Sequence, residues 1–161
     1  MSAASPHSAA TVFVSGSRSI ARLDTAASER LANILARRMR IVIGDAAGAD
    51  SAVQHYLAKA GCRDVTVFCS GARCRNNIGA WDVARVNADG FTGRAFYTRK
   101  DKVMARRADY GFVLWDGRSA GSLANMRELI AQTKPVLSYR AGDRAFMTLR
   151  TATDLSRFLG A

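Results

Sequence analysis

The chain has 161 residues, 48% of them hydrophobic and 23% charged, which is the composition of a soluble protein with one domain and its own core. No apolar run approaches the roughly 20 residues that a membrane-spanning helix needs, and residues 1–11 lack the basic start and apolar middle of a signal peptide. We therefore expect a cytoplasmic protein without a membrane partner, with residues 1–11 as a disordered tail and residues 12–161 as the domain.

The formal net charge of +11 raises the question of a nucleic-acid partner, because clustered basic side chains gain affinity from phosphates. The 20 arginines and 4 lysines are scattered, however, in small groups such as Arg37, Arg38 and Arg40, or the pair Arg106-Arg107. The scatter favours a solvated basic surface or one that attracts an anionic small molecule. Nucleic acid stays a less favoured partner.

Three cysteines, Cys62, Cys69 and Cys74, cannot all pair with one another, and in a chain without a secretion signal we expect reduced thiols. Cys69 and Cys74 have neither a second cysteine pair nor a histidine cluster near them in the sequence, so we expect no metal site. We also expect no cofactor.

The first predicted strand is Val12–Ser15, a short apolar run, and the turn Gly16-Ser17-Arg18-Ser19 follows it directly. A glycine turn after a first strand is where doubly wound folds bind phosphates, although the second and third glycines of the dinucleotide fingerprint are missing. Asp24 or Thr25 is then predicted to cap a helix that ends near Met39.

The second predicted strand, Ile41–Ile43, leads into a loop of small residues from Gly44 to Asp50. Gly44, Asp45 and Gly48 suit a main chain that lies close to a ligand. Asp50 has two interpretations, as the cap of the next helix or as a contact to a ribose or substrate. The sequence leaves both open.

The third predicted strand is Val65–Phe68, and residues 72–98 after it show no sustained periodicity. A loop of this length in a compact domain is usually a functional lid or a flexible insertion. Arg99–Arg107 is predicted to be a short helix.

The most informative stretch begins with the apolar strand Phe112–Trp115 and continues through the turn-rich loop Asp116–Gly121. Ser122 is predicted to cap the following helix, whose free backbone N–H groups would bind a phosphate or other anion. Val136–Tyr139 is predicted as a fifth strand, Ala145–Leu149 as an edge strand and Thr153–Leu159 as a closing helix.

Strands separated by helices predict an α/β, Rossmann-like domain with a parallel sheet of about five strands and helices on both faces. In the strand order 3-2-1-4-5, the exit loops of the first and fourth strands border the crevice where such sheets bind ligands. The loop from Gly44 to Asp50 lies one strand away. Three loops whose small residues let a ligand approach the main chain are therefore expected to converge.

These loops carry motifs that resemble those of a known family: Gly16-Ser17-Arg18, Gly44-x3-Gly48-Ala49-Asp50, Lys100-Asp101, Ala108-Asp109-x-Gly111 and Trp115-Asp116-Gly117-x-Ser119-x-Gly121-Ser122-x2-Asn125. They are similar to motifs of the SLOG superfamily, which includes the DprA single-strand DNA-binding proteins and the LOG phosphoribohydrolases, and most similar to its YspA-like branch. The resemblance implies a Rossmann-like domain that binds a nucleotide or a phosphoribosyl ligand.

LOG enzymes cleave the N-glycosidic bond of a nucleoside monophosphate with an Arg-Lys pair and a glycine-rich loop followed by a glutamate. Arg99-Lys100 and Gly121-Ser122 are similar to parts of that machinery. Asn125 stands in the place of the glutamate, and an amide cannot supply negative charge to a ribosyl centre. The carboxylates placed in the loops are Asp116 and Asp50.

The sequence therefore predicts a nucleotide-binding or phosphoribosyl-binding protein that forms a homodimer, with cleavage of the ligand left open. The alternatives are a single-stranded nucleic-acid-binding protein of the DprA type and a non-catalytic sensor or scaffold. The candidate catalytic residues are Asp116, Arg99 and Asp50. The candidate ligand-binding residues are Gly16, Ser17, Arg18, Gly44, Asp45, Gly48, Lys100, Trp115, Gly117, Ser119, Gly121, Ser122 and Asn125.

Overall fold

The computed structural model describes residues 9–160, so most of the predicted tail lies outside the described residues. The elements in chain order are β1 (Thr11–Gly16), α1 (Thr25–Ala36), β2 (Arg40–Gly44), α2 (Ala49–Lys59), β3 (Val65–Ser70), β4 (Asp82–Val86), α3 (Gly93–Arg107), β5 (Tyr110–Trp115), α4 (Ala120–Ala131), β6 (Val136–Arg140), β7 (Ala145–Leu149) and α5 (Ala152–Gly160). Among these residues, no helix combines the length and the apolar character needed to cross a bilayer.

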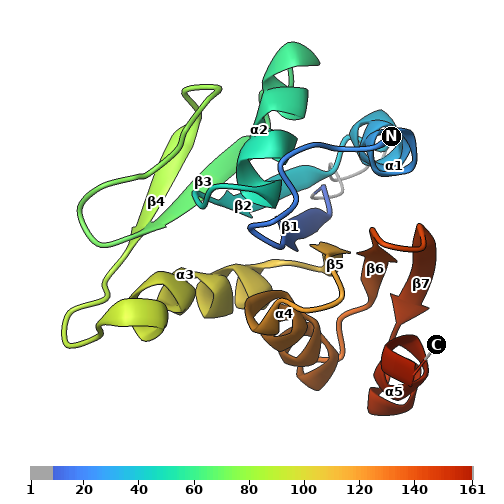
Figure 1. The fold of residues 1–161 in the computed structure, drawn as a ribbon. Helices are drawn as coiled ribbons and strands as arrows, with labels where there is room; N and C mark the ends of the chain where they lie inside the picture. The colour runs from blue at the N-terminus through green and yellow to red at the C-terminus, as the bar shows by residue number, and fades with distance from the viewer. Residues whose placement is uncertain (1–8, 161) are drawn as a thin grey trace, which may run out of the picture.

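All of the strands form one sheet in the order β4-β3-β2-β1-β5-β6-β7 (Figure 1). Every neighbouring pair is parallel except β6 and β7, which are antiparallel. The predicted α/β class and the order of the five predicted strands are confirmed, because β3-β2-β1-β5-β6 forms the middle of the sheet. The sheet has 7 strands, however, because β4 and β7 extend it at its two edges.

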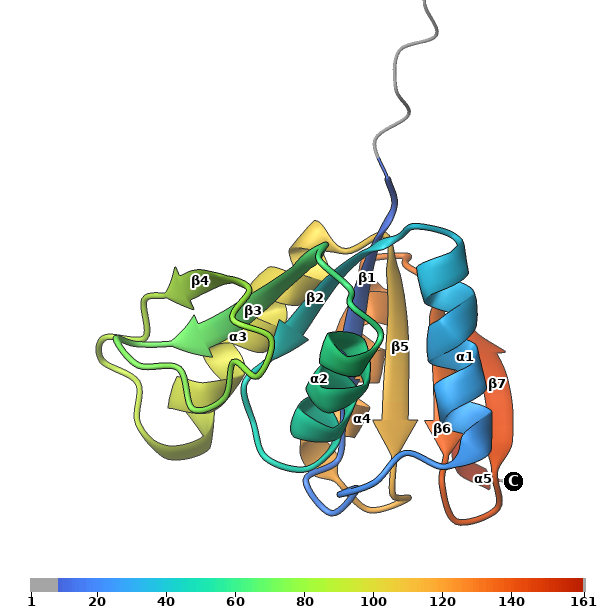
Figure 2. The same cartoon turned by 90° about the horizontal axis from the view of Figure 1, so that it is seen from above.

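Helices cover both faces of the sheet, and the strand residues alternate between two cores. Val12 and Val14 of β1 pack with α1 and α2, whereas Phe13 between them packs in the core under α3, α4 and α5. Figure 2 shows α1 and α2 in front of the sheet and the other three helices behind it. Because the helices after β1 and β5 lie on opposite faces, the exits of these two neighbouring strands border the switch point of a doubly wound sheet.

The segment 72–98 differs from its prediction as an irregular insertion. It contains β4, which pairs with β3 in parallel, and the first turns of α3, which begins at Gly93 rather than at Arg99. β4 lies at the edge of the sheet and its side chains are exposed or half-buried, so it lacks the apolar run that marks a buried strand. Backbone pairing with β3 holds it in place, together with the partly buried Ala84 and Val86, which pack against the core.

Candidate functional site

A cavity of about 490 Å³ lies where the carboxyl ends of β1, β2 and β5 meet. The side chains around it come from these strand exits, from the segment after β3, and from α3 and α4. The predicted residues that line it are Gly16, Arg18, Gly44, Asp50, Lys100, Asp116, Ser119, Gly121, Ser122 and Asn125. The three predicted loops therefore do meet at one place.

The exits of β1 and β5 are joined by Ser17, a buried residue behind the cavity wall. Its N–H donates to Leu114 O (2.9 Å), its hydroxyl accepts from Asp116 N (3.0 Å), and its Oγ lies 3.1 Å from Ser122 Oγ. Ser17 is 1% exposed, so it holds the two loops together and does not reach the cavity. The same corner is visible in Figure 2, where the loops after β1 and β5 lie at one end of the sheet.

Asp116 organises the loop before α4. Its Oδ1 accepts the N–H groups of Arg118 (2.8 Å) and Ser119 (2.7 Å), and its Oδ2 accepts the Ser19 hydroxyl (2.7 Å). Partial burial alone would raise the pKa of Asp116, but these hydrogen bonds to the ionised form outweigh it and lower the pKa to about 2. Asp116 is therefore ionised at neutral pH and shapes the loop.

The start of α4 differs from the prediction by three residues. Ser119, not Ser122, is the N-cap, and its hydroxyl accepts from Ser122 N (3.3 Å). The turn around Asp116 ends the loop early, so Ser122 lies in the first turn of the helix and is buried. At Gly121 an added Cβ would meet nothing closer than Ser119 Oγ at 3.9 Å, so the main chain is open to the cavity there.

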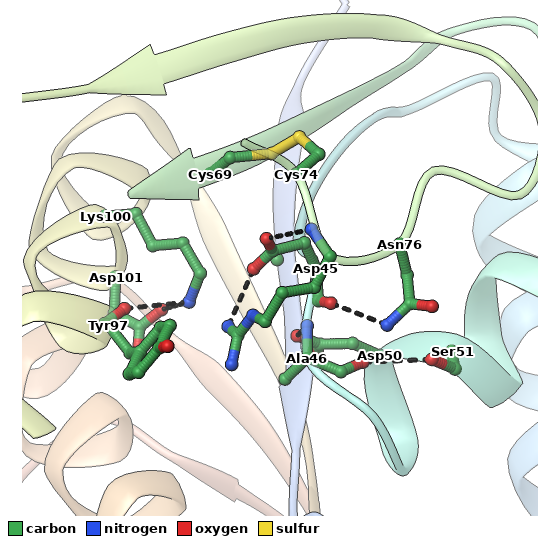
Figure 3. A network of polar contacts seen from close by, with 12 residues as sticks. Asp45, Ala46, Asp50, Ser51, Cys69, Cys74, Asn76, Tyr97, Lys100 and Asp101 are labelled. Carbon is green, nitrogen blue, oxygen red and sulfur yellow. Dashed lines mark hydrogen bonds and ion pairs between the residues drawn. A yellow bond between two sulfur atoms is a disulfide. The ribbon is translucent and has the colours of Figure 1, made fainter. Parts of the chain in front are cut away.

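At the exit of β2, Gly44 allows two buried ionisable side chains to approach the main chain. A Cβ at position 44 would lie 2.7 Å from Asp50 Oδ2 and 3.3 Å from Lys100 Nζ. Lys100 donates to Asp101 Oδ1 (3.0 Å) and to Tyr97 O (3.0 Å), as Figure 3 shows. Any larger residue at 44 would displace this group.

Asp50 is not the cap of α2, because Gly48 occupies that position and makes no side-chain cap. The Asp50 side chain instead accepts from Ala46 N (3.1 Å) and lies in the cavity wall with 7% of the residue exposed. Burial raises the pKa of Asp50 to about 7, against the attraction of Lys100 and with the help of the negative charges of Asp101 and Asp45. Near neutral pH this carboxyl can therefore hold or release a proton.

Sequence reasoning missed the part of the wall that comes from residues 75–101. Arg75, Arg94, Tyr97 and Thr98 line the cavity, yet no motif singles them out, and Asp101, which belongs to the Lys100-Asp101 motif, is not among the candidate residues. Arg75 is held by Asp45, which accepts from its backbone N–H (2.9 Å) and from its Nη2 (2.7 Å). The Arg75 guanidinium also lies 4.2 Å from the centre of the Tyr97 ring, in a cation–π contact.

Cys69 and Cys74 form a disulfide across a Cα–Cα distance of 5.2 Å, so the prediction of reduced thiols is wrong for these two residues. The turn after β3 brings them together, which the cysteine count could not reveal. Cys62 is a free cysteine, as predicted. One oxygen of Asp45 and the two sulfurs lie within 4.8 Å of one another, but a metal ion would need both sulfurs as thiolates.

Several predicted residues lie outside the cavity wall. Asp45 holds Arg75 by an ion pair, and Gly48 lets the start of α2 approach the turn after β1, since a Cβ there would lie 2.2 Å from Arg18 O. Trp115 packs against Phe158 and donates to Ser119 O (3.1 Å).

The remaining two, Arg99 and Gly117, are also absent from the wall. The Arg99 guanidinium lies 5.4 Å from the centre of the Phe91 ring. Gly117 has a φ of 84° and serves the turn before α4. Asn125, which does line the cavity, donates to Ser15 Oγ (3.1 Å).

Fold and site together define a doubly wound α/β protein with a polar cavity at its topological switch point. No protein-family model matches the chain, and no curated protein matches its sequence. Among solved structures, the chain is similar to DNA processing protein A (DprA) from Helicobacter pylori, a structure described for its single-stranded DNA binding mode. The TM-score is 0.60 at 15% sequence identity, over 94% of this chain and 72% of that one. The similarity is one of fold, and it agrees with the DprA part of the resemblance in the sequence.

Proposed function

We propose that this protein binds a nucleotide or a related phosphoribosyl ligand in the cavity at the exits of β1, β2 and β5. The observation that carries the proposal is the cavity itself. Its volume of about 490 Å³ falls within the range of roughly 300–1,000 Å³ that is usual for small-molecule sites. It also lies at the switch point, where open α/β sheets bind their ligands.

The ends of the cavity suit the two ends of a nucleotide. At the start of α4, the open main chain at Gly121 and the exposed side chain of Arg18 favour the phosphate. At the other end, Tyr97 presents an aromatic ring, and Asp50 presents a carboxyl that can accept a hydrogen bond from a sugar hydroxyl or a base amine. The ligand would lie along the wall between them.

Titration calorimetry with AMP, GMP, CMP and UMP tests this proposal. Gly121→Asp adds a negative charge where the Cβ has room, so we expect it to weaken binding at least about tenfold while the fold is kept. Gly142→Asp is the matched control, because position 142 is also open but lies outside the cavity lining. Equal affinities of wild type and Gly121→Asp, or no binding of any of the four nucleotides to wild type, would refute the proposal.

We assign binding rather than cleavage of the ligand. The amide of Asn125 cannot stabilise the positive charge that develops when an N-glycosidic bond breaks. Asp116 is committed to the loop by its hydrogen bonds, which leaves Asp50 and Asp101 as the carboxyl groups in the wall that could assist. Release of free adenine from AMP, seen by chromatography and lost in Asp50→Asn, would replace this assignment with that of a phosphoribohydrolase.

Single-stranded DNA is the second candidate ligand, and two observations favour it. The protein of similar fold from Helicobacter pylori binds single-stranded DNA, and this chain carries a net charge of +11. If DNA occupies the same cavity, AMP should displace a labelled oligothymidylate in a fluorescence anisotropy titration. Tight oligothymidylate binding that AMP does not reduce would instead indicate a DNA site elsewhere on the surface.

A further inference from the structure

The Cys69–Cys74 disulfide lies beside the cavity and is adjacent in sequence to one of its lining residues. Cys69 is fully buried near the end of β3, whereas Cys74 is half-buried in the following turn. The next residue is Arg75, which lines the cavity. The disulfide therefore restricts the backbone from which the Arg75 side chain extends.

Arg75 reaches the cavity through contacts that depend on this restricted backbone. Both its backbone N–H and its guanidinium donate to Asp45, and Asn76 Nδ2 donates to Asp45 O (2.8 Å; Figure 3). Asp45 is 1% exposed, while the Arg75 side chain is 30% exposed. Part of the Arg75 side chain thus stays exposed in the cavity wall, while Asp45 and Tyr97 hold its guanidinium in position.

The disulfide also covers the carboxylate that orients Arg75. An oxygen of Asp45 lies within 4.8 Å of both sulfurs, and Figure 3 shows the disulfide directly above Asp45. Closing this side of the ion pair keeps water away and strengthens the attraction between Asp45 and Arg75. With the bond open, water would reach the pair, and a thiolate at either cysteine would repel Asp45.

We propose that Arg75 is a ligand-binding residue whose position is set by the Cys69–Cys74 disulfide, so that the affinity of the cavity depends on the redox state of this pair. The proposal rests on the proposed function, because it concerns an anionic ligand in the same cavity. In reducing compartments, the disulfides that do form are usually transient and catalytic or redox-sensing.

The opening step is thiol–disulfide exchange with a dithiol. A thiolate of the dithiol attacks Sγ of Cys74, the less buried of the two cysteines, and Cys69 leaves as a thiolate that takes up a proton. The second thiol of the reagent then loses its proton and displaces Cys74 from the mixed disulfide. The protein gains two electrons and two protons, and the dithiol becomes a cyclic disulfide. The reverse exchange with a small-molecule disulfide closes the bond again.

The test compares AMP affinity by calorimetry for oxidised protein and for protein reduced with excess dithiothreitol. We expect reduction to weaken binding at least about tenfold, the effect of losing one well-oriented hydrogen bond to a charged group. Arg75→Gln should weaken binding of the oxidised protein by a similar factor and remove the redox response, because the two changes act on one contact. Cys74→Ser should hold the affinity at the reduced value in both conditions.

Cys62→Ser is the matched control, since this cysteine is free and lies outside the cavity lining. It should keep the full redox response. Alkylation of the unfolded oxidised protein should label one cysteine, and three after reduction. Labelling of three without reductant, or equal AMP affinity of oxidised and reduced wild type, would overturn the proposal.

Hydrogen–deuterium exchange of wild type separates this inference from the proposed function. If AMP binds neither form, the proposed function fails, and exchange alone decides whether the disulfide fixes the segment that carries Arg75. Faster exchange of residues 72–78 on reduction supports that part of the proposal. Unchanged exchange there overturns it, whatever the result with AMP.

Discussion

Two carboxyl groups of the cavity wall have opposite protonation behaviour because their surroundings differ. Asp116 accepts three hydrogen bonds from its own loop and from Ser19, so its ionised form is favoured. Asp50 accepts one hydrogen bond, from Ala46, and is almost fully buried, so its neutral form is favoured up to about pH 7. A buried carboxyl of this kind costs stability, which is typical of residues kept for a ligand.

Asp50 makes the stability of the fold depend on pH. Its pKa is about 7 in the folded protein against 3.8 ordinarily, so the folded state binds the proton more tightly than the unfolded state does. The resulting stabilisation is complete below about pH 4 and is lost as the pH rises to about 7. Asp50→Asn, which mimics the neutral form, should therefore raise the free energy of unfolding by about 4 kcal/mol at pH 8, about 1.4 kcal/mol for each pKa unit of the shift, and leave it nearly unchanged at pH 4.

Urea denaturation of both proteins across this pH range measures the difference. Asp109→Asn is a suitable control, because Asp109 is exposed at the opposite end of β5 from the cavity. Parallel stability curves for wild type and Asp50→Asn would show that burial does not favour the neutral form of Asp50.

At the scale of elements, α4 depends on a cap that the loop before it supplies. Ser119 Oγ accepts from Ser122 N and also from the Ser122 hydroxyl (3.3 Å each), so Ser119→Ala removes two contacts. We expect this substitution to lower the free energy of unfolding by about 1 kcal/mol, the usual cost of a lost serine cap. Ser119→Asn should retain most of the stability, because asparagine caps equally well.

Thr92 offers a matched comparison within the same chain. It precedes α3 as its N-cap residue but makes no side-chain cap, so Thr92→Ala should change the free energy of unfolding by less than Ser119→Ala does. Thermal or urea unfolding distinguishes the two. A Ser119→Ala protein as stable as wild type would mean that the Asp116 turn alone fixes the start of α4.

Sequence pattern predicts those elements whose side chains are buried on both faces of the sheet. The runs at Phe112–Trp115 and at Ile41–Ile43 lie between two cores and read as continuous apolar segments. β4 has no such apolar run, since Val83 is 37% exposed, and its backbone pairs with β3. The same limit applies to the site. The wall formed by strand exits follows from strand order, but Arg75 is placed by a disulfide and by Asp45, contacts that no local pattern encodes.

At the scale of the whole molecule, the net charge of +11 attracts any anion that approaches the protein. Some of the cavity's positive charge is already paired, because Arg75 contacts Asp45 and Lys100 contacts Asp101. Arg18 and Arg94 also line the cavity and form no ion pair among the described residues. A mononucleotide and a DNA strand would use this charge to different extents.

The two candidate ligands therefore predict different salt dependences. A DNA strand that neutralises about four phosphates should lose about 50-fold in affinity between 50 and 200 mM salt, because each phosphate contact adds roughly 0.7 to the slope. AMP, with one phosphate, should lose only about threefold over the same range. Fluorescence anisotropy with oligothymidylate and calorimetry with AMP measure the two slopes.

Arg94→Ala should reduce the DNA slope by about 0.7, whereas Arg150→Ala, an exposed position outside the cavity lining, should leave it within about 0.2. A DNA slope no steeper than that of AMP would mean that a strand gains nothing from phosphates beyond the one in the cavity, and the nucleotide would stand as the ligand.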